Sequence, residues 1–223
     1  MKSLNAQLVA FKTSVFERAD AHTACSLKTL EEEYRAEAAT ATPLAVGHRA
    51  PDVALHGADG KPHHLAKYAA QGPVFVLFFK GGWCPYSILT LRAWQDVAAE
   101  IRSAGGSIIA VSPQKASRAA LVQEHNGVSF PILADVGNKV AEAFGIVSNV
   151  KPLSREILLK LGCDLTDENT SGDLRLPRAA EFLIDRDGIV RFAHVSPVHF
   201  ERTEPRDALA VLRQLNAEAL APA

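Results

Sequence analysis

Cysteine, methionine and tryptophan are scarce in this chain, whose 223 residues hold 3 cysteines, 1 methionine and 2 tryptophans. The cysteines stand far apart, at Cys25, Cys84 and Cys163. Three such cysteines are too few for a disulfide framework, and an odd number leaves at least one thiol free within a monomer. The chain also lacks a charge imbalance, since 24 basic and 25 acidic residues give a formal net charge of −1. Nucleic acid and anionic membranes are therefore not expected partners.

Long apolar runs are missing as well. The longest, residues 74–79, is much shorter than the roughly 20 residues that a helix needs to cross a bilayer. The first 20 residues are charged at amphipathic spacing and lack the apolar core and small-residue cleavage site of a secretory signal. We therefore expect a cytoplasmic protein without a membrane partner.

The sequence gives no pattern of a metal site. His63 and His64 are adjacent, so on an extended chain they point to opposite faces, and the other histidines follow no ligand spacing. The acidic stretch 164–173 lacks the oxygen spacing and the closing glutamate of a calcium loop, and we interpret it as a solvated surface segment. No metal or other cofactor is expected.

What the chain does contain is 48% hydrophobic residues in regular patterns. Apolar side chains at helical spacing from Leu4 to Tyr34 predict an N-terminal helical arm, residues 1–42, followed by a second unit, residues 43–223. The amphipathic arm is compatible with a monomer and with a homodimer. Residues 148–176 are interpreted as an insertion that combines one short helix with an acidic loop.

Strands and helices alternate along the second unit. Strands are expected at 73–79, 107–113 and 130–135, helices at 87–105, 117–127 and 138–145, then a hairpin at 180–196 and a last helix at 204–220. Parallel strands joined by crossover helices, followed by a hairpin and a helix, predict a mixed central sheet with helices on both faces. The expected fold class is α/β, a thioredoxin-like three-layer fold with an N-terminal helical extension.

The strongest functional signal is the segment KGGWCPYS, residues 80–87, between an apolar strand and a long amphipathic helix. It places Cys84 at the helix N-terminus with Pro85 in the first turn. Unpaired backbone N–H groups and the positive end of the helix dipole favour the thiolate, which is the nucleophile. Gly82 lets a substrate approach the sulfur, and Ser87, one turn further on, is expected to donate a hydrogen bond to it. The alternative is a buried core cysteine.

Several segments together resemble one known family. KGGWCPYS, SIIAVSPQ, GNKVAEAFG and LPRAAEFLIDRDG are similar to the peroxiredoxin-like branch of the alkyl hydroperoxide reductase and thiol-specific antioxidant superfamily, and the helical arm is similar too. The resemblance covers nearly the whole chain. It implies a thioredoxin fold in which Cys84 becomes a sulfenic acid on reducing a peroxide and is then restored by another thiol.

The chain departs from that family at two places. Relatives usually carry a second cysteine where Ser87 stands, so the simplest internal resolving partner is absent. They also tend to have a cis proline where Ala179 stands, with Pro177 two residues earlier. A non-proline peptide prefers trans by roughly 2.5–4 kcal/mol. The loop facing Cys84 is therefore expected to be built differently.

Positive charge near the sulfur is also expected from the resemblance. The better-known peroxiredoxins polarise the peroxide with a threonine or serine where Gly81 stands and with an arginine close to the position of Arg178. Arg178 is therefore the first candidate and Lys80 a weaker one, the alternative for both being a solvated basic side chain.

Substrate contacts and a resolving thiol complete the predicted site. The substrate is expected to meet Gly82, Trp83, Pro85 and Ala179, where Trp83 either stacks on the substrate or shields the thiol. Cys163, in the insertion, and Cys25, in the arm, can each resolve an oxidised Cys84 only if the chain or a partner subunit brings them close. Otherwise Cys163 is a loop thiol and Cys25 a small helix residue.

Three functions stay open on this reading. The leading one is a cysteine-dependent peroxidase that reduces hydrogen peroxide or organic hydroperoxides at Cys84. It would be regenerated by an external thiol, either a thioredoxin-like protein or a low-molecular-weight thiol. The second is a monothiol oxidoreductase, because Cys84 and Ser87 form a CxxS pattern that supports mixed disulfides. The third is a non-catalytic binding protein that keeps the fold.

Overall fold

A mixed sheet forms the centre of the molecule in the computed structural model, which describes residues 3–57, 61–169 and 171–220. Within that part of the chain the sheet has seven strands in the order β2-β1-β5-β4-β3-β8-β9. The strands are β1 (Ala54–His56), β2 (Pro62–His64), β3 (Val74–Phe78), β4 (Ser107–Ser112), β5 (Ile132–Ala134), β8 (Ala180–Ile184) and β9 (Val190–Val195). Strand β3 pairs parallel with β4 and antiparallel with β8. The predicted mixed sheet is confirmed.

Helices cover both faces of this sheet. They are α3 (Leu65–Gln71), α4 (Pro85–Ser103), α5 (Ala116–His125), α6 (Lys139–Ala143), which follows the 3-10 turn η1 (Val136–Asn138), and α9 (Pro205–Leu220). Side chains of β3 alternate between the two faces, as a strand requires. Phe75 and Leu77 pack with Trp94 of α4 and with α9, whereas Val76 and Phe78 pack on the other face with α3 and α6. The three-layer arrangement expected from the sequence is therefore present.

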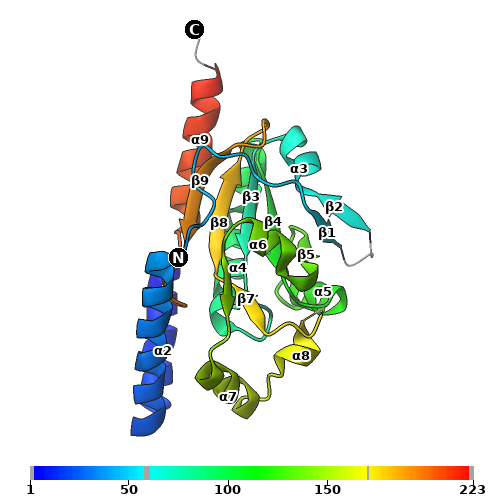
Figure 1. Cartoon of the computed structure of the whole chain (residues 1–223). Coiled ribbons are helices and arrows are strands. Elements are labelled where there is room, and N and C mark those ends of the chain that lie inside the picture. Colours follow the sequence, from blue (N-terminus) through cyan, green and yellow to red (C-terminus); the bar gives the residue numbers. More distant parts are fainter. Residues whose placement is uncertain (1–2, 58–60, 170, 221–223) are drawn as a thin grey trace.

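The N-terminal arm consists of two helices, α1 (Leu4–Arg18) and α2 (Ala21–Thr40). Each begins at a capping side chain, because Ser3 accepts from the N–H of Ala6 and Asp20 from that of Thr23. The Glu204 carboxylate, at the start of α9, accepts from the N–H of Leu4 at 2.9 Å. Figure 1 shows α2 beside the lower end of the sheet, with α7 at the same end. The boundary of the arm at residue 42 stays a prediction.

The predicted insertion is bounded by a short antiparallel pair, β6 (Val147–Asn149) and β7 (Arg175–Pro177). Between them lie two helices, α7 (Pro152–Lys160) and α8 (Leu165–Glu168). The expectation of one helix and an acidic loop was wrong at α8. Asp164 caps this helix by accepting from the N–H of Thr166 at 3.0 Å, and Asp167 and Glu168 complete an acidic first turn. These are helix-start signals rather than loop signals.

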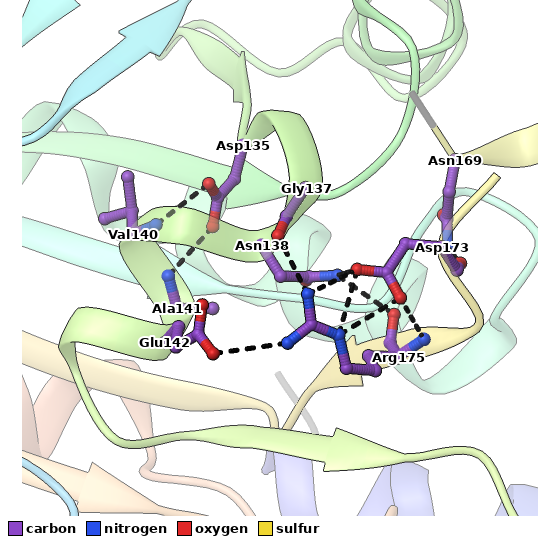
Figure 2. A network of polar contacts seen from close by, with 9 residues as sticks. All are labelled: Asp135, Gly137, Asn138, Val140, Ala141, Glu142, Asn169, Asp173 and Arg175. Carbon is purple, nitrogen blue, oxygen red and sulfur yellow. Dashed lines mark hydrogen bonds and ion pairs between the residues drawn. The ribbon is translucent and has the colours of Figure 1, made fainter. Parts of the chain in front are cut away.

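A polar network fixes the beginning of β7, as Figure 2 shows. The Arg175 guanidinium donates to the Asp173 carboxylate at 2.9 Å and lies 3.3 Å from a Glu142 carboxylate oxygen. The backbone oxygen of Arg175 accepts from the side-chain amide of Asn138 at 3.0 Å. Because Arg178 follows β7 directly, this network also sets the position of that arginine.

In the described part of the chain no helix is long and apolar enough to cross a membrane.

Candidate active site

Cys84 occupies the N-cap position of α4, and Pro85 is the first residue of that helix. The N–H of Cys84 donates to the carbonyl of Gly81 at 3.2 Å, which closes the turn between β3 and α4. The residue is buried, with 7% of its surface exposed, and its thiol is free. The predicted place of this cysteine at a helix N-terminus is confirmed.

Both glycines before the cysteine are required by packing. Gly81 has a φ of 153°, and a Cβ there would lie 2.5 Å from Nε1 of Trp83. A Cβ on Gly82 would lie 2.3 Å from the side chain of Val122. The N–H of Gly82 donates to the side-chain oxygen of Gln114 at 2.8 Å. The loop therefore approaches its neighbours more closely than a side chain permits.

Ser87 does not interact with the sulfur as predicted. Its side chain is buried, and its hydroxyl has no hydrogen-bond partner among the described residues. Cys84 has an extended backbone at the N-cap and makes no side-chain bond to the first turn of α4. The rule that side chains three residues apart face each other holds within a helix. Here it fails because Cys84 is the N-cap residue and its backbone is not helical.

Lys80 lines the same cavity as Cys84. Its ammonium lies 3.1 Å from Nδ1 of His199 and 5.0 Å from the centre of the Tyr34 ring. Burial lowers the pKa of Lys80 to about 8, although a negative charge on Cys84 acts in the opposite direction. Burial and the charge of Lys80 hold the pKa of His199 well below its ordinary value. The imidazole is therefore neutral near pH 7 and can accept a hydrogen bond from the ammonium.

Arg178 is buried rather than solvated, with 6% of its surface exposed. Its guanidinium lies 3.3 Å from the carboxylate of Glu37, which belongs to α2 of the arm. Arg178 and Ala179 line a second, very small cavity of about 20 Å³ that also touches Lys80. Described peptide bonds are all trans, including that of Ala179. Arg178 thus does not line the cavity of Cys84, whereas Lys80 lines both cavities.

Arg202 is a further buried cation that sequence patterns did not indicate. Its guanidinium donates to the hydroxyl of Ser196 at 2.9 Å and to the carbonyl of Val198 at 3.1 Å. Burial lowers its pKa, whereas Glu181 and Cys84 raise it. No local pattern could have indicated this residue, or Tyr34 and His199. Only the tertiary fold brings Tyr34 and His199 to the cavity of Cys84, and Arg202 to where the charge of Cys84 affects its pKa.

The cavity on which Cys84 opens has a volume of about 260 Å³. Trp83, Cys84 and Pro85 form one wall, and apolar side chains of α1, α2 and α7 form the others. Of the residues predicted to contact the substrate, Trp83 and Pro85 therefore line the same cavity as Cys84. Gly82 packs against Val122 and does not line this cavity, and Ala179 lines the small neighbouring cavity.

The two other cysteines differ in their surroundings. Cys25 is exposed on α2. Cys163 follows α7, and its N–H donates to the carbonyl of Leu158 at 2.9 Å. Burial raises the pKa of Cys163 to about 11, with smaller contributions from Glu168 and other acidic groups, Cys84 among them. Cys163 is therefore a thiol at neutral pH, and a negative charge on Cys84 contributes to its raised pKa.

Among the described residues no group of three possible ligands gathers to hold a metal.

Comparison with known proteins agrees with this geometry. The AhpC/TSA family model matches residues 46–193, which include β3, Cys84, β8 and the first part of β9. This chain belongs to the AhpC/TSA family. The helical arm of this AhpC/TSA protein precedes the matched residues.

Individual relatives support the same conclusion. A putative peroxiredoxin of Mycobacterium tuberculosis (strain CDC 1551 / Oshkosh) is 30% identical over 104 residues, which cover 47% of this chain and 66% of that protein. Thiol-disulfide oxidoreductase ResA of Geobacillus thermodenitrificans is 30% identical over 106 residues, covering 47% and 60%. The chain thus spans 66% and 60% of the length of these two curated relatives, less than two thirds of each.

Solved structures share the fold. The crystal structure of peroxidoxin BcpB from Mycobacterium tuberculosis gives a TM-score of 0.63 at 22% identity and covers 77% of this chain and 98% of that chain. Reduced Prx3 from Vibrio vulnificus gives 0.62 at 19% identity and covers 76% of this chain and 99% of that chain. The thioredoxin-like α/β fold expected from the sequence is therefore confirmed.

Proposed function

We propose that this protein is a cysteine-dependent peroxidase that reduces hydrogen peroxide or organic hydroperoxides at Cys84. The observation that carries the proposal is the free Cys84 at the start of α4, sharing a cavity with the Lys80 ammonium. The helix N-terminus and the ammonium both favour a negative sulfur. Membership of the AhpC/TSA family supports the same chemistry.

The reaction begins when the Cys84 thiolate attacks the terminal oxygen of the peroxide. An S–O bond forms and the O–O bond breaks, so the sulfur is oxidised by two electrons to a sulfenic acid and the peroxide is reduced. The leaving alkoxide or hydroxide takes a proton and departs as an alcohol or water. Lys80 is the proton donor in this proposal, because it lines the cavity and its pKa is about 8. The positive charges of Arg202 and Arg178 also help to lower the pKa of Lys80.

Regeneration needs two external thiols in this scheme. The first condenses with the sulfenic acid, giving a mixed disulfide and water, and the second releases the Cys84 thiol and carries away a disulfide. A thioredoxin-like protein or a low-molecular-weight thiol fits this role. Cys163 is the internal alternative, because a negative charge on Cys84 contributes to raising its pKa. The raised pKa leaves little Cys163 thiolate to attack the sulfenic acid in this conformation.

Stopped-flow oxidation of the reduced protein by hydrogen peroxide, followed by mass spectrometry, tests the proposal. We expect a sulfenic acid on Cys84 and catalytic peroxide consumption with dithiothreitol. Cys84→Ser should abolish consumption, and Cys25→Ser, which changes an exposed residue, should keep it. A disulfide between Cys84 and Cys163 would assign the resolving step to Cys163. If Cys84 forms no sulfenic acid with any peroxide, the proposal fails and a non-catalytic role is favoured.

A second candidate is thiol–disulfide exchange. Two observations favour it, namely the CxxS spacing of Cys84 and Ser87 and the likeness to a thiol-disulfide oxidoreductase. Such an enzyme would form a mixed disulfide between Cys84 and an oxidised substrate without prior exposure to peroxide. Incubating the reduced protein with oxidised glutathione separates the two candidates, since rapid glutathionylation together with slow peroxide oxidation would favour exchange.

We further propose a cytoplasmic location, where thiol reductants are available. The arm is the surface by which a homodimer would form. Sedimentation of the full chain tests this, because a monomer at micromolar concentration would exclude the dimer.

A further inference from the structure

The Lys80 side chain brings a primary amine into the cavity of Cys84. Both residues line that cavity, and the turn between them is closed by the N–H of Cys84, which donates to the carbonyl of Gly81 at 3.2 Å. After burial, the charge of Cys84 is the strongest influence on the pKa of Lys80. When Lys80 gives its proton to the leaving alkoxide or hydroxide, a neutral amine and a new sulfenic acid share one cavity.

We propose that the Lys80 amine condenses with the Cys84 sulfenic acid to a sulfenamide, a reversible bond between nitrogen and sulfur. The inference rests on the proposed peroxidase function and adds a modification site to it. The nitrogen attacks the sulfur, so the S–N bond forms and the S–O bond breaks. The leaving hydroxide takes one hydrogen from the nitrogen and departs as water. The sulfur keeps the oxidation state that it reached with the peroxide, so no further oxidant is needed.

Two external thiols reverse the modification. The first attacks the sulfur and breaks the S–N bond, which gives a mixed disulfide on Cys84 and returns a hydrogen to the Lys80 nitrogen. The second thiol releases the Cys84 thiol and carries away a disulfide. Until a thiol arrives, the S–N bond prevents a second peroxide from converting the sulfenic acid to the irreversible sulfinic acid. The modification thus protects Cys84 when reductant is scarce.

The backbone partner that follows the sulfur is missing in this chain. A sulfenic acid can condense with a backbone nitrogen to form a sulfenamide. The residue after Cys84 is Pro85, the first residue of α4, and a proline nitrogen carries no hydrogen. The N–H of Cys84 itself is held by the Gly81 carbonyl. A side chain therefore has to supply the nitrogen.

Two lysines line the cavity, and their surroundings distinguish them. The Lys12 nitrogen lies 2.6 Å from a carboxylate oxygen of Glu31, and a neutral amine would lose this ion pair. The Lys80 nitrogen lies 3.1 Å from Nδ1 of the neutral His199, and burial lowers its pKa to about 8. At pH 7 about a tenth of Lys80 is therefore neutral even before it gives a proton to the leaving group. Lys80 is the amine suited to attack the sulfur.

The other thiols of the chain compete poorly for the same sulfenic acid. Neither Cys25 nor Cys163 lines the cavity, and Cys25 is exposed on α2. Burial raises the pKa of Cys163 to about 11, so at pH 7 only about one molecule in ten thousand carries the thiolate. The neutral Lys80 amine is present about a thousandfold more often than that thiolate.

The test uses the Cys25→Ser/Cys163→Ser protein, in which Cys84 is the remaining cysteine and no disulfide can form within the chain. The reduced protein is treated with hydrogen peroxide in the absence of thiols, and its intact mass is followed while Cys84 is oxidised. We expect a monomer about 2 Da lighter than the reduced protein, in place of a stable sulfenic acid about 16 Da heavier. Dithiothreitol should restore the reduced mass.

Lys80→Arg and Lys12→Arg, made in the same protein, form a matched pair. Both keep the positive charge, and arginine stays protonated and is no nucleophile. The variants are compared at equal extent of Cys84 oxidation, because Lys80 also acts in the oxidation itself. Lys80→Arg should lose the lighter species and accumulate the sulfenic and then the sulfinic acid, whereas Lys12→Arg should keep it. A lighter species that survives in Lys80→Arg, or that disappears in Lys12→Arg, overturns the inference.

Tryptic mapping of the unmodified chain keeps the inference testable if Lys80→Arg fails to fold. In the reduced protein trypsin cleaves after Lys80 and separates residues 68–80 from residues 81–92. A sulfenamide blocks this cleavage, so one peptide covering residues 68–92 is expected after peroxide and should disappear with dithiothreitol. Complete cleavage after Lys80 in protein with an oxidised Cys84 overturns the inference and leaves the proposed function standing. Absence of Cys84 oxidation by any peroxide would instead refute the proposed function.

Discussion

Replacing Lys80 by methionine is expected to stabilise the fold and to slow the oxidation of Cys84. Burial lowers the pKa of this lysine from 10.5 to about 8. Each tenfold change in acidity corresponds to about 1.4 kcal/mol, so a protonated Lys80 destabilises the folded protein by about 3 kcal/mol at pH 7. Methionine has a similar length and carries no charge, and up to that amount of free energy of unfolding should therefore be gained.

The same reasoning fixes the pH dependence. Lys80 holds a proton up to pH 10.5 in the unfolded chain but only up to about pH 8 in the folded one. Between these values the unfolded state binds more protons, so the free energy of unfolding rises with pH. The destabilisation is fully present below pH 8 and is relieved towards pH 10.5. The wild type should show this rise, by about 3 kcal/mol, and Lys80→Met should lack it.

Urea denaturation from pH 7 to 10.5 measures the stability, and quenched oxidation by hydrogen peroxide measures the reaction. At pH 7 the variant should react about a hundredfold more slowly, because proton transfer by a positioned group contributes at least this much. The wild-type rate should decline above pH 8 as Lys80 loses its proton. Lys67→Met, at an exposed position on α3, is the control for the loss of a charge. A less stable Lys80→Met with an unchanged rate would refute the reasoning.

Three further predictions concern neighbouring features. Gly82→Ala should lower the free energy of unfolding by about 1–3 kcal/mol, because its Cβ would lie 2.3 Å from the side chain of Val122; urea denaturation should show partial rescue by Val122→Ala. Cys163, whose pKa is raised from 9.0 to about 11, should react with iodoacetamide at pH 8 about a hundredfold more slowly than an ordinary thiol, as timed labelling and mass spectrometry can measure. Arg175→Ala should cost about 1–3 kcal/mol in the same denaturation assay, because it leaves the carboxylate of Asp173 without its guanidinium partner.

Each of these has an outcome that contradicts it. Undiminished stability of Gly82→Ala would mean that the loop before Cys84 shifts freely. Cys163 labelling at the same rate in the native and the urea-unfolded protein would show that its surroundings do not protect it. An unaltered Arg175→Ala would show that the network in Figure 2 is dispensable for β7.

The order of strands and helices could be predicted from the sequence because it depends on local patterns. Apolar runs and helical periodicity placed the β3–α4–β4 unit, and the Pro85 signal placed Cys84 at a helix start. The prediction was wrong at α8 because this helix is only about one turn long. Asp164 begins it in a stretch whose acidic composition is equally typical of a loop.

The surroundings of the sulfur were decided by the tertiary structure. Lys80 contacts His199, which lies 119 positions further along the chain. Helical or strand periodicity in a sequence cannot predict a contact over such a separation. The predicted hydrogen bond from Ser87 to Cys84 was wrong for a related reason, because Cys84 precedes α4 with an extended backbone and the spacing rule holds only within a helix.

By itself, then, the sequence determined where the nucleophile stands, because a strand, a glycine turn and a helix start are local features. Only the tertiary structure decided what faces that nucleophile. The apolar side chains of α1, α2 and α7 and the neutral His199 line the cavity of Cys84 and come from distant segments. Their positions follow from how the arm and the end of the sheet bury their apolar surfaces together, which is a property of the whole chain.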